Sequence, residues 1–276
     1  MERLGTLYVV STPIGNLGDI TYRAVETLRA VGLILAEDTR HTRTLLTRYE
    51  VRGRTESYHE HNEAEMTPRV LTELEKGTDV ALVSDAGTPL LSDPGARLVE
   101  AAIERGVPVV PIPGASALLA AIVVSGLDGS AFMFVGFLPR RGGERVRTLE
   151  MLSGLPQTSV LYEAPSRLGS TLQELEQLGC GSRRVVVARE LTKQFEEFRR
   201  GTVSELALYY ADVTPKGEVV IVLGGRVEPQ VDEIELEGVA RELRAKGYSS
   251  REVASALQSE HGAPRNLAYR LAHEPR

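Results

Sequence analysis

Three short segments of the sequence combine glycine and proline with small polar residues, a composition that suits ligand binding. They are residues 12–19 (TPIGNLGD), 84–89 (SDAGTP) and 113–117 (PGASA). Glycine lets a backbone approach a ligand closely, and Asp85 could accept hydrogen bonds from a ribose diol or an amino group. Each segment alone also fits an ordinary strand-to-helix turn, with Asp85 or Ser116 as a helix cap, so none decides the function singly.

Charged residues gather in a fourth segment, residues 36–41 (AEDTRH). Adjacent side chains of a strand point to opposite sides, so Glu37 and Asp38 are not expected to act together as an acid/base pair. One of them is expected to pair with Arg40 instead. His41 could carry a proton, although a single histidine more often has a structural role.

Charged groups also stand beside the strands predicted for the second half of the chain. They occur in residues 162–167 (YEAPSR), 189–193 (RELTK) and 216–218 (KGE). Charges at strand ends are often solvated and inert, so each segment is a modest indication. Because ligands of α/β proteins bind where strands end, the segments together predict a polar cleft between two domains.

Arginine is concentrated in residues 138–147 (LPRRGGERVR), where four arginines and one glutamate give a local charge of +3 in a chain of net charge −6. Guanidinium groups match the geometry of phosphates, which favours a polyanionic partner. The sequence contains no tryptophan, so folded RNA recognised by its shape and backbone is favoured over a stacked single strand. The predicted RNA contacts are Arg40, Arg43, Arg140, Arg141, Arg145 and Arg147.

The elements that position these segments alternate between strands and helices. Residues Ala24, Val25, Leu28 and Val31 have helical spacing, with Asp19 or Thr21 as the cap. The strands around them are apolar on both faces, which is typical of a parallel sheet covered by helices on both sides. The strands predicted for this first α/β domain, residues 1–113, are residues 4–11, 33–36, 80–83 and 107–112.

A second α/β domain is predicted for residues 114–226. Its longer polar connections favour a mixed sheet over a parallel one. The strand candidates are residues 132–137, 158–162, 185–188 and 219–223.

A small helical module is predicted for residues 232–276, after a linker at residues 224–225 and 227–231. One helix should end near Gly247, since glycine suits a left-handed cap. The next should begin at Ser249, with Glu252 completing a capping box, and a third should begin at Pro264 after a stop at Gly262. The short turns resemble a helix-turn-helix bundle.

The composition, 276 residues with 42% hydrophobic and 25% charged, is that of an ordinary folded protein. No apolar run reaches the roughly 18 residues needed to span a bilayer, and the chain starts directly in a strand-like segment. A cytoplasmic protein without a membrane partner is therefore expected. The single cysteine, Cys180, excludes an internal disulfide and a multi-cysteine zinc site, and no metal site is recognisable.

The motifs TPIGNLGD, AEDTR, SDAGTP, PGASA, GFLPR, YEAPSR, RELTK and GE, in this order, make the sequence similar to the tetrapyrrole methylase superfamily. The likeness extends from residue 7 to about residue 223. Within the superfamily, the sequence resembles the branch that methylates a cytidine 2′-hydroxyl in bacterial small-subunit (16S) ribosomal RNA, and the helical module resembles that branch's appended domain. The resemblance implies two α/β domains that bind S-adenosylmethionine in the cleft between them, and a homodimer.

The same resemblance implies which residues surround the cofactor. One set would border its polar groups and its methionine or adenosine portion, and another set would close the site from the second domain. They are Pro13, Ile14, Gly15, Asp85, Gly87, Thr88, Ser116 and Ala117, then Tyr162, Leu191 and Gly217.

A ribose hydroxyl is a poor nucleophile until its proton is removed, so a base near the acceptor is expected. The candidates are Lys193, Glu37, Asp38 and Glu163. Lys193 is slightly favoured, provided that burial or nearby arginines lower its pKa, and it fits a phosphate contact equally well.

Two alternatives remain open at this point. A methyltransferase acting on a small tetrapyrrole would share the fold and cofactor, but would leave the arginine loop and the helical module unexplained. A DNA-binding regulator without enzymatic activity would use the helical module, although its third helix offers only Arg265 and Arg270 as cations. The salt dependence of substrate binding distinguishes a tetrapyrrole methyltransferase from an RNA methyltransferase. RNA binding weakens steeply as salt rises, whereas binding of a macrocycle should not.

Overall fold

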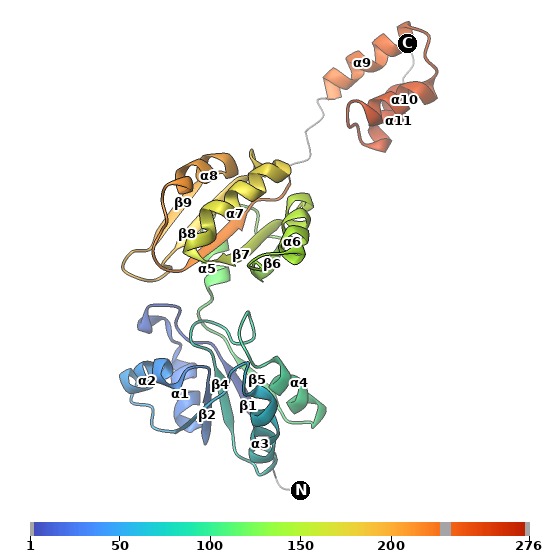
Figure 1. Cartoon of the computed structure of the whole chain (residues 1–276). Coiled ribbons are helices and arrows are strands. Elements are labelled where there is room, and N and C mark those ends of the chain that lie inside the picture. The colour runs from blue at the N-terminus through green and yellow to red at the C-terminus, as the bar shows by residue number, and fades with distance from the viewer. Residues whose placement is uncertain (1–2, 227–232, 274–276) are drawn as a thin grey trace. The chain divides into compact units, whose positions relative to one another are not determined.

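The computed structural model describes residues 3–226 and 233–273 (Figure 1). The chain divides into two compact units, Met1–Arg226 and Val227–Arg276. Residues 227–231 of the predicted linker lie outside the described residues. The larger unit contains two five-stranded sheets, and the smaller unit is helical.

The first sheet is entirely parallel, as predicted, and has the strand order β3-β2-β4-β1-β5. Four of its strands were predicted, and the edge strand β3 was missed. Its sequence is Arg-Thr-Glu-Ser and it is partly exposed, so it has none of the apolar pattern that marks the others. The strands are β1 (Leu7–Val10), β2 (Leu33–Ala36), β3 (Arg54–Ser57), β4 (Val80–Val83) and β5 (Val109–Ile112).

Helices cover both faces of this sheet because successive strand residues point to opposite sides. Leu33 and Leu35 of β2 pack with α3 (Glu63–Glu75) and α4 (Ala96–Glu104). Ile34 and Ala36 pack with α1 (Tyr22–Ala30) and α2 (Thr39–Arg48). The side chain of Thr21 caps α1, which decides between the two predicted caps.

The second sheet is mixed, as predicted, with the order β6-β7-β10-β8-β9. Strands β6 and β7 are parallel, and the other neighbours are antiparallel. The edge strand β9 was missed because its sequence, Glu-Phe-Arg-Arg-Gly-Thr, is largely polar. The strands are β6 (Phe132–Phe137), β7 (Thr158–Glu163), β8 (Arg184–Arg189), β9 (Glu197–Thr202) and β10 (Val219–Leu223).

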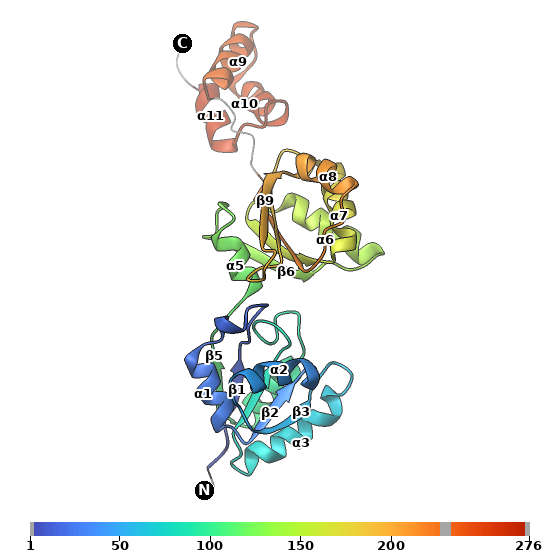
Figure 2. The ribbon, with the colours of Figure 1, turned by 90° about the vertical axis from the view of Figure 1, so that its left-hand side faces the viewer.

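Helices also cover both faces of the second sheet (Figure 2). One face packs against α6 (Gly143–Gly154), α7 (Leu168–Leu175) and α8 (Val203–Ala211). The other packs against α5 (Ala117–Val123), and Ile14 from the loop after β1 joins the same apolar cluster. Short helical turns occur at Leu17–Asp19, Pro165–Arg167 and Glu176–Cys180.

The smaller unit consists of α9 (Glu233–Ala245), α10 (Ser250–Ser259) and α11 (Arg265–His273), which share one apolar cluster. Gly247 follows α9 with a positive φ of 89°. Ser249 and Glu252 form the predicted capping box of α10. Helix α11 begins one residue after Pro264, at Arg265. Across the residues that the structure describes, no helix is long and apolar enough to cross a membrane.

Candidate functional site

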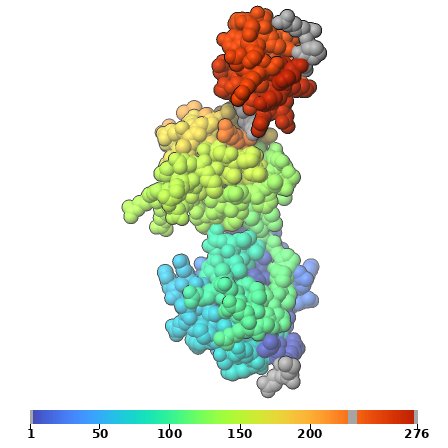
Figure 3. Space-filling view, turned by 90° about the vertical axis from the view of Figure 1, so that its right-hand side faces the viewer, coloured from blue at the N-terminus to red at the C-terminus, as the bar shows by residue number. Residues whose placement is uncertain are grey.

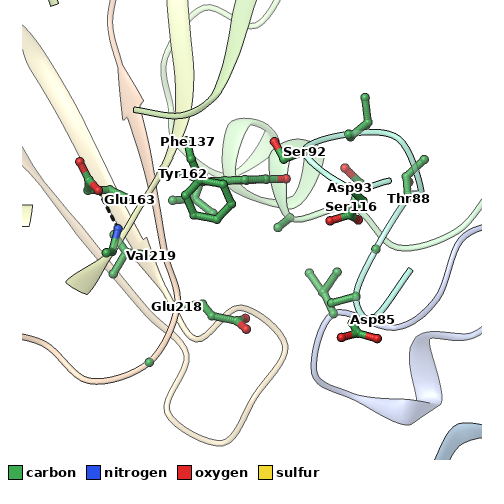
Figure 4. Close-up of a pocket in the computed structure, with 18 of the residues that line it drawn as sticks. Asp85, Thr88, Ser92, Asp93, Ser116, Phe137, Tyr162, Glu163, Glu218 and Val219 are labelled. Atoms are coloured by element: carbon green, nitrogen blue, oxygen red, sulfur yellow. Dashed lines mark hydrogen bonds between the residues drawn. The ribbon is translucent and has the colours of Figure 1, made fainter. Parts of the chain in front are cut away.

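A cavity of about 380 Å³ lies where loops of the first sheet meet the second sheet within the larger unit. The first sheet contributes the loops that follow β1, β2, β4 and β5, and the second contributes the ends of β6 and β7 and the start of β10. We call this cavity the central pocket. Figure 4 shows Asp85, Asp93 and Ser116 on one side of it and Phe137 and Tyr162 on the other.

Hydrogen bonds join the loops of the first sheet into one rim. The backbones of Thr12 and Gly87 exchange two hydrogen bonds, of 2.8 and 3.1 Å. Asp85 Oδ1 accepts a hydrogen bond of 3.0 Å from the backbone N–H of Asp38. Asp85 therefore connects the loops after β2 and β4, and the alternative in which it caps the following helix is wrong. Ser116 does cap α5, and it also lines the pocket.

The loop between β4 and α4 contains unusual backbone conformations. Leu90 and Ser92 both have a φ of 73°, a left-handed conformation that costs free energy in residues other than glycine. Ser92, Asp93 and the preceding Leu91 all line the central pocket. The strained loop thus brings a second Ser-Asp pair, residues 92–93, to the same cavity as Asp85.

Among the carboxyl groups that line the central pocket, we call Glu37, Asp85 and Asp93 the carboxylate cluster. Burial raises the pKa of Asp93 to about 6, and the negative charges of Glu37 and Asp85 act in the same direction. Burial and the nearby charge of Asp85 also raise the pKa of Glu37. Among the described residues, no cation forms an ion pair with any of the three. Such a cluster can accept a proton or attract a cationic ligand.

An aromatic wall, Phe137 and Tyr162, faces the carboxylate cluster. Tyr162 packs edge-to-face against Phe134 and Phe137, with ring centroids 5.0 and 5.4 Å away. Strand β6 has a bulge between Phe134 and Gly136, and Gly136 adopts a φ of 71°. The bulge turns Phe137 to the pocket side, and Phe137 is 58% exposed there. This wall offers a flat apolar surface to a ligand.

Glu163, a candidate base, is wrongly assigned. Its side chain is fully buried and pairs with Arg145 and Arg167. Its two oxygens also accept hydrogen bonds from the backbone of Ala164 and the hydroxyl of Thr171. In Figure 4 the carboxylate points away from Tyr162 and the carboxylate cluster. Glu163 therefore lines the central pocket while its carboxylate is engaged by buried partners.

Asp38 is also wrongly assigned as a base. Its side chain caps α2 and pairs with Arg40 at 2.9 Å, which confirms the predicted pairing within this segment. Hydrogen bonds from the side chain and backbone of Arg40 lower its pKa to about 2. A carboxylate with so low a pKa is a weak proton acceptor at neutral pH.

Lys193 does not meet the condition set for its role as a base. Burial acts to lower its pKa, but hydrogen bonds to Glu218 and Glu190 outweigh that effect and the pKa is raised. Nζ lies 2.9 Å from Glu218 and 3.0 Å from Glu190. Its aliphatic chain lies against Gly15, where an added Cβ would stand 2.4 Å from Lys193 Cγ. The raised pKa argues against Lys193 as the base and is compatible with its alternative role as a phosphate contact.

A second cavity, of about 400 Å³, adjoins the first, and we call it the α2 pocket. Asp85 lines both cavities. The other residues that line the α2 pocket come from the loop after β1, from helix α2, from the end of β4 and from the loop after β8. They are Thr12, Pro13, Gly15, Leu17, His41, Thr42, Thr44, Leu45, Ser84 and Lys193.

Comparison with known proteins places this geometry in a family. The family model described as Tetrapyrrole (Corrin/Porphyrin) Methylases matches residues 6–207. The chain belongs to the tetrapyrrole methylase family. A relative named "Ribosomal RNA small subunit methyltransferase I" from Mesorhizobium japonicum is 48% identical over 96% of this chain and 90% of its own. A protein of the same name from Synechocystis is 46% identical over 98% of both chains.

Solved structures of lower identity share the tetrapyrrole methylase fold. Diphthine synthase superposes with a TM-score of 0.63 at 16% identity, covering 81% of this chain and 91% of its own. Uroporphyrin-III C-methyltransferase from Thermus thermophilus, in complex with S-adenosylhomocysteine, gives 0.58 at 22% identity and covers 80% and 97%.

The residues that the family resemblance assigns to the cofactor occupy three places. Pro13 and Gly15 line the α2 pocket. Leu191 is buried in the apolar cluster that contains Ile14. The remaining residues line the central pocket: Ile14, Asp85, Gly87, Thr88, Ser116, Ala117, Tyr162 and Gly217.

Sequence reasoning missed Ser92, Asp93 and Phe137 and gave Glu218 only as part of a charged segment, although all four line the central pocket. The repeat of Ser-Asp at positions 84–85 and 92–93 is a signal that could have indicated Asp93. Phe137 carried no such signal, because its direction depends on the bulge in β6.

The arginines assigned to RNA do not share one environment. Arg140 and Arg141 are exposed in the loop between β6 and α6, which projects from the surface in Figure 3, and Arg147 is exposed on α6. Arg40 and Arg43 are exposed on α2. Arg145 is wrongly assigned, because it is buried and bonded to Glu174 and Thr171. It cannot reach a phosphate in this arrangement.

Proposed function

We propose that this protein is an S-adenosylmethionine-dependent methyltransferase that methylates the 2′-hydroxyl of a cytidine in small-subunit (16S) ribosomal RNA. The observation that carries the substrate is the near-full-length identity, 46–48%, with relatives named for small-subunit ribosomal RNA. Family membership supports the methyl transfer. The choice of the ribose of cytidine extends beyond those names and rests on the motif resemblance.

The central pocket fits S-adenosylmethionine in its chemistry. The aromatic wall, together with Ala117 and Gly87, suits a flat adenine, and Asp85 can accept hydrogen bonds from polar groups. The carboxylate cluster complements a positive sulfonium. We therefore propose that the residues lining this pocket hold the cofactor, and that Pro13, Gly15 and Leu191 support the surrounding loops.

When bound, S-adenosylmethionine supplies an already activated methyl group. The protein must orient the acceptor hydroxyl, exclude water and receive the proton that the hydroxyl loses as its oxygen forms the new bond to carbon. The carboxylate cluster is suited to receive that proton, because burial and neighbouring negative charge raise the pKa of both Glu37 and Asp93. We retain Glu37 from the original candidates and add Asp93.

RNA would be held by exposed arginines around the larger unit: Arg40, Arg43, Arg140, Arg141 and Arg147. Within the described chain, Arg43, Arg140, Arg141 and Arg147 form no ion pair, so their guanidinium groups are available to phosphates. Arg40 would exchange or share its contact with Asp38.

The remaining features of the proposal concern assembly and location. We propose three domains, residues 1–113, 114–226 and 232–276, and a homodimer in the cytoplasm, where ribosomal subunits are found. Exposed apolar side chains on α5, Leu119 and Val123, support an interface between copies.

The test uses purified protein, labelled S-adenosylmethionine and small ribosomal subunits from a strain that lacks its own copy of this enzyme. The RNA is then digested and its nucleosides are separated by mass. We expect label in 2′-O-methylcytidine. Label in another nucleoside would overturn the acceptor and keep the class. Absence of label in RNA, with S-adenosylhomocysteine still bound by the protein, would favour a small-molecule methyltransferase.

A further inference from the structure

We propose that the α2 pocket is the site that receives the acceptor nucleoside of the RNA chain. This inference rests on the proposed function and assigns a substrate site to a cavity next to the central pocket. At about 400 Å³ the α2 pocket has a volume within the range of small-molecule sites. It opens beside the helix that carries Arg40 and Arg43.

Helix α2 has the charge expected beside a nucleic acid backbone. Its sequence, Thr-Arg-His-Thr-Arg-Thr-Leu-Leu-Thr-Arg, contains three arginines and no acidic residue. Arg43 and Arg48 are exposed and form no ion pair anywhere in the described ranges. The same helix contributes His41, Thr42, Thr44 and Leu45 to the pocket wall. Phosphates bound by the arginines would therefore place the attached nucleoside at the pocket.

The lining of the α2 pocket suits a nucleoside better than a purely apolar ligand. Hydroxyl groups of Thr12, Thr44 and Ser84 lie among the apolar surfaces of Pro13 and Leu45. A ribose and a base edge present the complementary donors and acceptors.

Thr42 provides an independent observation. It also lines the α2 pocket, and its side chain is 3% exposed. Its hydroxyl has no hydrogen-bond partner among the described residues. A buried hydroxyl without a partner costs free energy, and a hydrogen bond to a ligand in the pocket would offset that cost.

Asp85 connects the α2 pocket to the central pocket. Because Asp85 lines both cavities, a nucleoside in one would lie next to a cofactor in the other. Gly15 and Lys193 also line the α2 pocket, and the aliphatic chain of Lys193 lies against Gly15.

The experiment fills the pocket with a large side chain and measures the two ligands separately. Thr44 is exposed on α2 and lines the pocket, so Thr44→Trp should fold normally. Thr47→Trp, at an exposed position of the same helix outside the lining, is the matched control. Binding of small ribosomal subunits is measured in the presence of S-adenosylhomocysteine, and binding of S-adenosylhomocysteine alone is measured by calorimetry.

We expect Thr44→Trp to raise the Kd for subunits and the KM for RNA about tenfold or more, the scale of losing one well-placed base contact. The Kd for S-adenosylhomocysteine should stay within about twofold, and Thr47→Trp should match the unmodified protein in every measurement. Unchanged subunit binding by Thr44→Trp would overturn the proposal. So would a comparable loss of S-adenosylhomocysteine binding, which would assign the α2 pocket to the cofactor. If the unmodified protein does not methylate subunits at all, the proposed function fails instead.

Discussion

Two groups of acidic side chains border the central pocket, and they differ in whether cations pair with them. Glu163 is fully buried, but two arginines, a hydroxyl and a backbone N–H surround its carboxylate. The carboxylate cluster is less buried, yet no described cation pairs with Glu37, Asp85 or Asp93. Compensation by cations marks a carboxylate that stabilises the fold, whereas its absence beside a cavity marks one available to a ligand.

The largest effect is expected from substituting Glu163, whose negative charge is paired with two arginines. Glu163→Gln would leave Arg145 and Arg167 without their buried partner and should lower the free energy of unfolding by about 3–5 kcal/mol. Chemical denaturation checks this. At low temperature the protein that remains folded should keep its turnover within about threefold, because Glu163 points away from the pocket. A folded variant of normal stability that has lost its turnover would reverse the two roles.

The second largest effect is expected from substituting Asp93 of the carboxylate cluster, which has no cationic partner among the described residues. Asp93→Asn should lower kcat about 100-fold, the scale of losing a general base. It should raise the free energy of unfolding at pH 7 by about 1 kcal/mol, because it removes a charge that burial disfavours and that solvent only partly screens.

Asp128→Asn is the control for that substitution, since Asp128 is exposed and lies outside the central pocket. Turnover, S-adenosylhomocysteine binding and denaturation are compared for both variants. Normal turnover by Asp93→Asn would show that Asp93 neither receives the proton nor assists the group that does.

A smaller effect should follow from pH. If deprotonated Asp93 is required, with its pKa at about 6, kcat should fall about tenfold between pH 7 and pH 5. Stability should change in the opposite direction. The folded state binds a proton more tightly than the unfolded state, so the contribution of Asp93 becomes more favourable as pH falls from about 6 towards 4. A pH–rate profile identical in Asp93→Asn would assign the pH dependence to another group.

The smallest effect is expected on the binding of ribosomal subunits, where the exposed and buried arginines of residues 138–147 should differ. The double substitution Arg140→Ala and Arg141→Ala should weaken subunit binding about fivefold and reduce the salt dependence of log Kd by about two phosphate contacts. Arg145→Met should lower stability and leave the salt dependence unchanged, because Arg145 is enclosed by Glu174 and Thr171. Equal salt effects from both variants would remove the distinction.

The buried strands were predicted well from the sequence because each is a continuous run of apolar residues. Leu33–Ala36 and Val80–Val83 were predicted with the observed bounds. The edge strands Arg54–Ser57 and Glu197–Thr202 were missed because an exposed strand is held by backbone hydrogen bonds to its neighbour, which leave little trace in side-chain pattern.

The site was predictable where it followed strand ends, and unpredictable where it depended on partners distant in sequence. Asp85 and Tyr162 were named as site residues from their motifs, and both line the central pocket. The role of Lys193 depends on Glu218, which no local pattern links to it. Arg145 did carry a signal: it shares a helical face with Leu149 and Leu152 at spacings of four and seven, and that face is buried.

The bulge in β6 determines which of its side chains face the central pocket. Regular alternation would place Phe134 and Phe137 on opposite faces, yet both contact Tyr162, while Val135 and Leu138 turn towards the core behind the sheet. The extra residue at the bulge therefore changes the phase of the strand midway along its length. Deleting it would leave Phe137 opposite Tyr162, because the residues beyond the bulge are already in register with β7. A regular strand that kept all of its residues would instead turn Phe137 to the core side and Leu138 to the pocket side, so the aromatic wall depends on accommodating one extra residue in β6.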